Sequence, residues 1–104
     1  MRIPDYTLRG LVNYVENGCP TGGFLYAVLT NDLFGAIGQA DRENRPALQE
    51  IVQWLYWVPP GGCKGSVDRV QTWLDMDPEQ RADILALCPS WQEFRQETVP
   101  QEVA

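Results

Sequence analysis

The stretch from Pro20 to Asp41 constrains the fold most, because it is apolar enough to enter a core and yet is repeatedly interrupted. It reads PTGGFLYAVLTNDLFGAIGQAD, with glycines and an Asn-Asp break between its apolar runs. One long helix would not tolerate these interruptions well, since each internal glycine costs about 1 kcal/mol relative to alanine. The stretch therefore predicts two short elements, at 24–29 and 33–40, that pack tightly.

The second of these elements combines an apolar side with a glycine side. Leu33, Phe34 and Ile37 share one face of a helix, which predicts that this face packs into the core. Gly35 and Gly38 lie three residues apart on one side. Glycines so placed either allow a neighbouring helix to approach closely or form part of a ligand surface, and both interpretations stay open.

The segment before this stretch predicts an amphipathic helix. Its apolar residues recur at i, i+3, i+4 and i+7, at Leu8, Leu11, Val12 and Val15. Asp5 or Thr7 can cap its start, and Gly18 fits just beyond its end. Pro20 then prevents the helix from continuing.

Segment 45–58 predicts the central helix of the fold. Asp41 or Asn44 can cap it, and Pro46 is tolerated only within its first turn, which places the helix start near 41–45. Within 51–58, Gln53 is the single polar residue apart from the aromatic side chains. A helix that is apolar all round is normally buried all round, so we expect the other helices to surround this one.

Two further helices follow a glycine-rich connector. Ser66 caps a helix whose apolar face consists of Val67, Val70 and Leu74. The sequence Asp77-Pro78-Glu79 places a cap, a proline and an acid in the order typical of a helix start. Pro89 must interrupt that helix, which leaves a last turn capped by Ser90.

No pair of strands joined by a hairpin turn is visible, so the predicted fold class is all-α. We expect a compact bundle of five or six short helices around a central buried helix. Residues 1–97 form a single helical domain, with a core at 1–74 and an acidic helical extension at 75–97. Residues 98–104 lack a core pattern and predict a flexible tail.

The negative charge is concentrated at the C-terminal end. The net charge is −6, and residues 75–104 hold seven acidic and two basic residues, against seven and six in residues 1–74. No basic stripe that could follow a phosphate backbone is present, which argues against direct nucleic-acid binding.

The composition also argues against catalysis, metal binding and membrane insertion. The chain has no histidine, the commonest general base, and no motif replaces it, so we expect no enzyme and no cofactor. Cys19, Cys63 and Cys88 are widely spaced, which predicts free thiols and no metal site. No apolar run is long enough to span a membrane.

The connector Gly61-Gly62-Cys63-Lys64-Gly65-Ser66 is a candidate anion-binding loop. It leads into a helix N-terminus, where backbone N–H groups and the ammonium of Lys64 could hold a phosphate or carboxylate. Lys64, Gly65 and Ser66 are the predicted ligand-binding residues of this alternative. The loop does not match the Walker pattern, and an ordinary glycine-rich connector explains it equally.

The same loop contains one of the three cysteines, Cys63. The charge of Lys64 and the nearby helix start would lower the pKa of this thiol, which we expect to be a free surface thiol.

The aromatic residues and the acidic segment provide the strongest functional indication. A domain of 104 residues with four tryptophans either buries them or leaves some exposed as anchors for another protein. An acidic surface steers association with a basic partner. The predicted partner-binding residues are Trp73, Asp75, Asp77, Glu79, Asp83 and Trp91.

One long motif has a counterpart elsewhere. Residues 20–34, P-T-G-G-F-L-Y-A-V-L-T-N-D-L-F, resemble a family of short uncharacterised bacteriophage and prophage proteins with a GGFLxAVLxNDLF motif. Later sequence motifs of this family correspond to Trp54-Leu55-Tyr56, Cys63-Lys64-Gly65-Ser66 and Val70-Gln71-Thr72-Trp73. The resemblance covers about residues 3–74 and brings no known activity or catalytic residues.

The resemblance implies a phage accessory protein in the host bacterial cytoplasm. Such proteins often inhibit or redirect a host protein, and some block antiviral defence. We therefore expect a non-enzymatic protein that binds a host protein with a basic surface. A nucleotide-type ligand bound by loop 61–66 and a homo-oligomer with an aromatic interface are the two alternatives.

Overall fold

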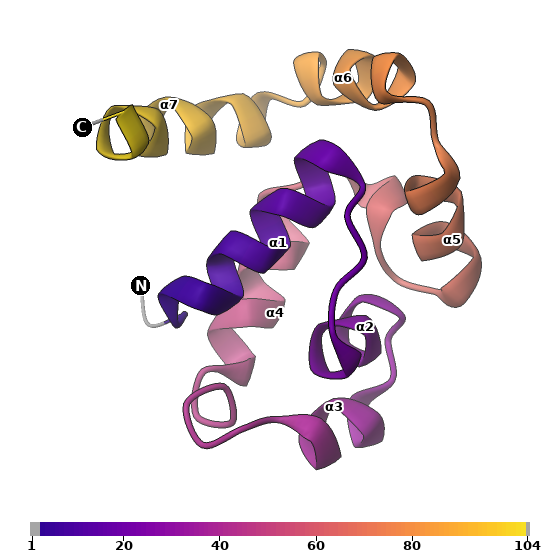
Figure 1. Cartoon of the computed structure of the whole chain (residues 1–104), viewed down its shortest axis with the longest axis vertical. Helices are drawn as coiled ribbons and strands as arrows, with labels where there is room; N and C mark the ends of the chain where they lie inside the picture. The colour runs from indigo at the N-terminus through magenta and orange to yellow at the C-terminus, as the bar shows by residue number, and fades with distance from the viewer. Residues whose placement is uncertain (1–2, 104) are drawn as a thin grey trace.

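A computed structural model describes the backbone of residues 3–103 and the side chains as far as Glu97. Within this part the chain forms seven α-helices, one short 3₁₀ helix and no strand, so the all-α class is confirmed (Figure 1). The elements are α1 (Asp5–Asn17), α2 (Gly23–Leu29), α3 (Leu33–Gln39), α4 (Leu48–Trp57), η1 (Gly61–Cys63), α5 (Val67–Asp75), α6 (Pro78–Ala86) and α7 (Pro89–Val103).

The molecule is a flat body with extents of 34 × 33 × 19 Å. In Figure 1, α1 lies in front of α4, the short pair α2 and α3 lies below α1, and α6 and α7 run along the top. One core cluster contains residues of every helix except α3. Leu11 and Val15 of α1, Ile51 of α4 and Trp73 of α5 are among its most buried members.

The predicted helix starts and ends are confirmed at several positions. Gly18 ends α1 in the left-handed conformation, with φ of 66°, and its N–H donates to the carbonyl of Tyr14. Ser66 Oγ accepts the N–H of Arg69 at the start of α5, and Asp77 accepts the N–H of Glu79 at the start of α6. In contrast, neither Asp5 nor Thr7 caps α1, whose N-cap is Pro4.

The predicted central helix differs from what the structure shows. Helix α4 starts at Leu48 rather than near 41–45, because Asp41 caps a separate turn by accepting the N–H groups of Glu43 and Asn44. The helix is also not buried all round: Ile51, Trp54 and Leu55 are buried, while the opposite face is in solvent.

The C-terminal part contains a full helix where a last turn was predicted. Pro89 interrupts α6 as expected, but it begins α7, a helix of 15 residues, and the described part of the chain therefore holds seven helices instead of five or six. Ser90 does not act as a cap, since its hydroxyl donates to the carbonyl of Val58 at 2.7 Å. The predicted tail, residues 98–104, lies outside the described side chains, and α7 extends to Val103.

Candidate functional site

Helix α3 presents its apolar residues to solvent. Leu33 is 62% exposed, Phe34 90% and Ile37 47%, which makes the prediction of a core-facing side wrong. The helix has only seven residues, and Ala36 is the one residue of the helix that is buried. Neither glycine of α3 lies against a neighbouring helix: a Cβ at Gly35 would meet the capping carboxylate of Asp32, and a Cβ at Gly38 would meet nothing within 4 Å.

Helix α4 adds a second exposed apolar face. Val52 is 47% exposed, Tyr56 69% and Trp57 70%. The rings of Tyr56 and Trp57 contact each other edge to face, with centroids 4.8 Å apart. Large apolar side chains that gather on one surface mark interaction sites more often than scattered ones do.

A groove, called here the α3–α4 groove, is lined by Leu33 of the first face and by Val52 and Tyr56 of the second. It has a volume of about 570 Å³ and is open to solvent. Ala36 and Leu55 are buried and form its floor, while Leu33, Val52 and Tyr56 are exposed along its sides. Further lining residues are Val28, Asn31, Asp32, Leu48, Gly61, Lys64, Gly65 and Arg69.

Two cations, Lys64 and Arg69, lie at the loop end of the groove. The ammonium of Lys64 donates to the carbonyls of Pro59 and Pro60 at 3.2 and 3.3 Å, and its partial burial lowers its pKa. Arg69 is exposed on α5, and its Nη1 reaches the carbonyl of Lys64 at 3.5 Å. Among the described side chains, neither cation pairs with a carboxylate.

The candidate anion loop is largely occupied by its own contacts. The N–H of Gly65 donates to the carbonyl of Leu29 at 2.7 Å, which closes the loop onto the end of α2. The N–H of Cys63 donates to Pro60, and the hydroxyl of Ser66 caps α5. Of the predicted ligand residues, Lys64 and Gly65 line the groove, whereas Ser66 does not.

Cys63 is not the surface thiol that the sequence predicted. Its side chain is fully buried, and its Sγ contacts the carbonyl of Pro60 at 3.1 Å. Burial raises the pKa of this thiol to about 12, and the nearby charge of Lys64 only partly opposes the shift. Among the described residues, no group of three or more metal-ligating side chains lies together.

Trp73 and Trp91 belong to the core. Each is 1% exposed, so neither can contact a partner in this structure, and their selection as partner-binding residues needs correction. The indole N–H of Trp73 donates to the carbonyls of Tyr14 and Val15, and Trp91 packs edge to face against Trp54. Both tryptophans are buried because α5 and α7 turn them toward α1 and α4, a tertiary arrangement that helical spacing does not reveal.

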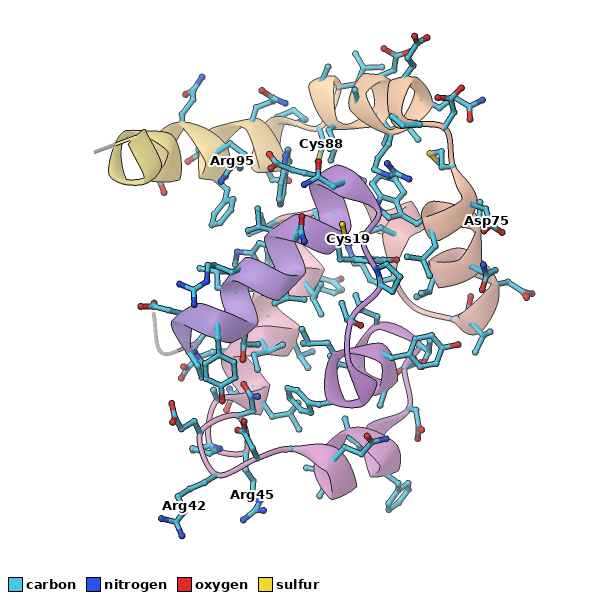
Figure 2. All side chains as sticks on the ribbon, in the orientation of Figure 1. Cys19, Arg42, Arg45, Asp75, Cys88 and Arg95 are labelled. Atoms are coloured by element: carbon cyan, nitrogen blue, oxygen red, sulfur yellow. The ribbon has the colours of Figure 1, made fainter. Side chains whose placement is uncertain are left out.

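The four acidic residues of the predicted partner surface are exposed: Asp75, Asp77, Glu79 and Asp83. Asp75 lies on the outer side of α5 (Figure 2). The two cations of residues 75–97, Arg81 and Arg95, do not pair with these four carboxylates. Arg81 is 3% exposed and points inward, and Arg95 pairs with Glu16 of α1 at 2.8 Å.

Sequence reasoning missed the groove itself. Its exposed walls come from Leu33 of α3 and from Val52 and Tyr56 of α4. Apolar spacing predicts a core position for Leu33, and a helix 45–58 that is buried all round would cover Val52 as well. For the aromatic side chains, the sequence leaves core and partner anchor open. A weak signal was present, since α4 carries more apolar residues than the one stripe that a packed helix can bury.

No protein-family model matches the chain, and neither does any curated protein or any solved structure. The resemblance to phage proteins therefore stays a prediction. In residues 3–103, no helix combines the length and the apolar character needed to cross a membrane.

Proposed function

We propose that this chain is a non-enzymatic phage protein that binds a host protein and modulates or inhibits it in the bacterial cytoplasm. The motif at residues 20–34 suggests the phage origin, and the same resemblance suggests a component of antiviral defence as the class of target. The absence of histidine from the sequence supports a binding role over catalysis.

The observation that carries the proposal is the exposed apolar surface around the α3–α4 groove. Tyr56, which lines the groove, is 69% exposed, and its sequence neighbour Trp57 is 70% exposed. Phe34, which follows the lining residue Leu33, is 90% exposed. Aromatic side chains at the centre of an interface supply much of the binding energy. The proposed anchor set therefore moves from Trp73 and Trp91 to the surface of α3 and α4.

The acidic segment gives a second, electrostatic contribution to the same proposal. Its carboxylates are exposed and the cation Arg81 is buried, so that the surface of residues 75–97 presents mainly negative charge to a partner. A basic surface on the host protein would be attracted to it, which raises the rate of association.

Affinity capture from bacterial lysate tests the proposal with a matched pair of variants. Val52→Glu places a charge on the groove wall, where the side chain is 47% exposed, and Val67→Glu places the same charge on the first residue of α5, where it is 55% exposed and does not line the groove. The wild type and the Val67→Glu variant should retain one dominant host protein, and the Val52→Glu variant should lose it. Retention of nothing specific would refute the proposal, and equal retention of one host protein by all three chains would refute the role of the groove in it.

A nucleotide-type ligand remains a second candidate, because a groove of about 570 Å³ with two cations at one end also fits a small anionic molecule. A thermal-shift screen against nucleotides tests it, since a ligand of the native state raises the melting temperature. The Lys64→Ala variant should then lose the shift. No shift with any nucleotide would exclude this candidate.

A further inference from the structure

The walls of the α3–α4 groove match the surface of a helix. The residues that α4 contributes, at 48, 52, 55 and 56, follow the i, i+4, i+7, i+8 spacing of one helix face. On the α3 side, Leu33 of the wall and Ala36 of the floor are three residues apart. Ridges with this spacing pack into the grooves between the side chains of another helix.

An extended peptide is a poorer match. Peptides in strand form bind by adding to the free edge of a sheet, where main-chain groups are available. The described part of this chain has no strand and therefore no such edge. The groove offers side chains instead, which favours an occupant whose own backbone groups are satisfied within a helix.

The charge at the loop end indicates which kind of helix fits. Lys64 and Arg69 line the groove next to each other, and neither has a carboxylate partner among the described side chains. The groove is also lined by one carboxylate, Asp32, which accepts the N–H of Gly35 at the start of α3. The ammonium of Lys64 uses two of its three N–H groups on the Pro59 and Pro60 carbonyls, and the exposed guanidinium of Arg69 keeps most of its donors available. An acidic side chain of the occupant would supply the missing partner for both cations.

A second copy of the chain is a less suitable occupant. Two copies that each carry a net charge of −6 repel one another, and association would have to overcome this repulsion. A separate protein is not subject to this constraint.

We infer that the α3–α4 groove binds an amphipathic helix of the partner protein, with apolar side chains in the groove and an acidic residue at the end near Lys64 and Arg69. This inference rests on the proposed function and adds the chemistry of the partner segment. The apolar contacts supply affinity, and the acidic residue sets the direction in which the helix lies.

A peptide titration of the full chain tests the inference. Three synthetic helical peptides would share the same leucine stripe and differ only at one end, where they carry two glutamates, two glutamines or two lysines. Amide chemical shifts of the isotopically labelled protein would report both the affinity and the site. The glutamate peptide should bind about fivefold more tightly than the lysine peptide, with shifts at residues that line the groove.

Three variants make the result specific. Arg69→Glu should reverse the preference, so that the lysine peptide binds more tightly. Arg42→Glu is the matched control, because Arg42 points away from the body in the turn before α4 and does not line the groove (Figure 2), and it should leave the preference unchanged. Val52→Glu should abolish binding of all three peptides while the far-ultraviolet circular dichroism spectrum shows that the variant is folded.

Several outcomes would overturn the inference. Equal affinity for the three peptides, or a preference that Arg69→Glu leaves unchanged, would refute the acidic partner. A concentration-dependent dimer that Val52→Glu removes would show that a second copy occupies the groove, and binding to phosphatidylcholine vesicles that the same variant removes would show a lipid. If lysate capture depends on Val52 but no peptide binds, the proposed function stands and this inference fails. If the lysate yields no specifically retained host protein, the proposed function itself is refuted.

Discussion

At the scale of single residues, the position of Arg81 most clearly links packing to charge. Its Nη2 donates to the carbonyls of Trp73 at 3.0 Å and Met76 at 2.7 Å, at the end of α5. The guanidinium also lies against Gly18, at the end of α1, and over the Trp73 ring. The carboxyl ends of two helices thus compensate a buried cation, because helix ends carry partial negative charge there.

Replacing this residue should therefore be costly. Arg81→Ala leaves the carbonyl of Met76 without its donor, removes one of the two donors to the carbonyl of Trp73 and removes the packing against the Trp73 ring. We expect it to lower the free energy of unfolding by about 3 kcal/mol. Urea unfolding followed by tryptophan fluorescence measures the loss. Arg69→Ala, at an exposed site, is the control and should change stability by less than about 0.5 kcal/mol. Similar effects of the two variants would contradict the structural role of Arg81.

A hydrogen bond at the surface predicts a dependence on pH. Tyr6 donates to the carboxylate of Asp41 at 2.6 Å, which joins α1 to the turn before α4. This bond raises the pKa of Tyr6 from 10.0 to about 12 and lowers the pKa of Asp41 below 3.8. A lowered carboxyl pKa contributes stability above its ordinary value, and this stability is lost as the pH falls through the lowered pKa. A raised tyrosine pKa contributes stability below 10.0, and it is lost as the pH rises toward 12.

The Tyr6→Phe variant isolates this contribution. Its melting temperature should be lower than that of the wild type at pH 7, and the difference should narrow as the pH falls below 3.8, because protonated Asp41 no longer favours the bond. Thermal unfolding between pH 2.5 and pH 7 measures the difference. The hydroxyl of Tyr26 makes no hydrogen bond among the described residues. The control variant Tyr26→Phe should therefore differ from the wild type by an amount that does not change with pH. A difference that stays constant over this range would contradict the assignment.

At the scale of elements, local sequence signals predicted the helices that have distinct boundaries. The apolar spacing of α1, with Gly18 at its end, needs only nearby residues to specify it. The same holds for α5 and α6, which begin at side-chain caps provided by Ser66 and Asp77. These interactions span a few residues, so they can be recognised without knowledge of the tertiary structure.

Which apolar faces are covered could not be predicted in this way. Leu33 and Val52 continue apolar patterns that look like core, yet both remain exposed, while Trp73 and Trp91 are buried. Coverage depends on which helix packs over which, and the long-range contacts between α1, α4, α5 and α7 decide that. The groove is therefore a feature of the tertiary structure, and the loop 61–66 reveals only its charged end.

Two glycines form a matched pair for testing the helix assignments. Gly18 is in the left-handed conformation, with φ of 66°, and a Cβ there would collide with the guanidinium of Arg81. Gly38 lies inside α3, where a Cβ would meet nothing within 4 Å. Gly18→Ala should therefore destabilise the protein by at least about 2 kcal/mol, and Gly38→Ala should stabilise it by about 0.5–1 kcal/mol. Urea midpoints of both variants check this, and a destabilising Gly38→Ala would show that α3 is not the open helix described.

At the scale of the whole molecule, apolar and acidic surfaces occupy different parts of the chain. The apolar groove belongs to α3, α4 and the start of α5, whereas the acidic surface belongs to the end of α5, α6 and α7. The first surface can supply affinity and the second can steer association, because charged rims mainly affect association rates.

Charge reversal tests the steering contribution. The variant carries three substitutions, Asp75→Lys, Glu79→Lys and Asp83→Lys. Asp77 is left unchanged because it caps α6. We expect the captured host protein to bind this variant about tenfold more weakly at low salt, and the salt dependence of its association rate to disappear.

The control for this variant carries the same change in net charge elsewhere. Its replaced residues are Asp5→Lys, Glu43→Lys and Asp68→Lys, which are all exposed. Stopped-flow measurement of association at several salt concentrations compares the two variants. An equal effect of both would show that net charge alone matters, and unchanged binding of the first variant would refute the electrostatic contribution.

The most direct measurement for the account as a whole is amide hydrogen exchange of the chain with and without the captured host protein. If the α3–α4 groove is the binding surface, exchange should slow in residues 31–36 and 52–57, whose side chains include the exposed apolar residues. Protection confined to residues 75–97, or no protection at α3 and α4 in a formed complex, would contradict the central claim that the exposed apolar groove binds the partner.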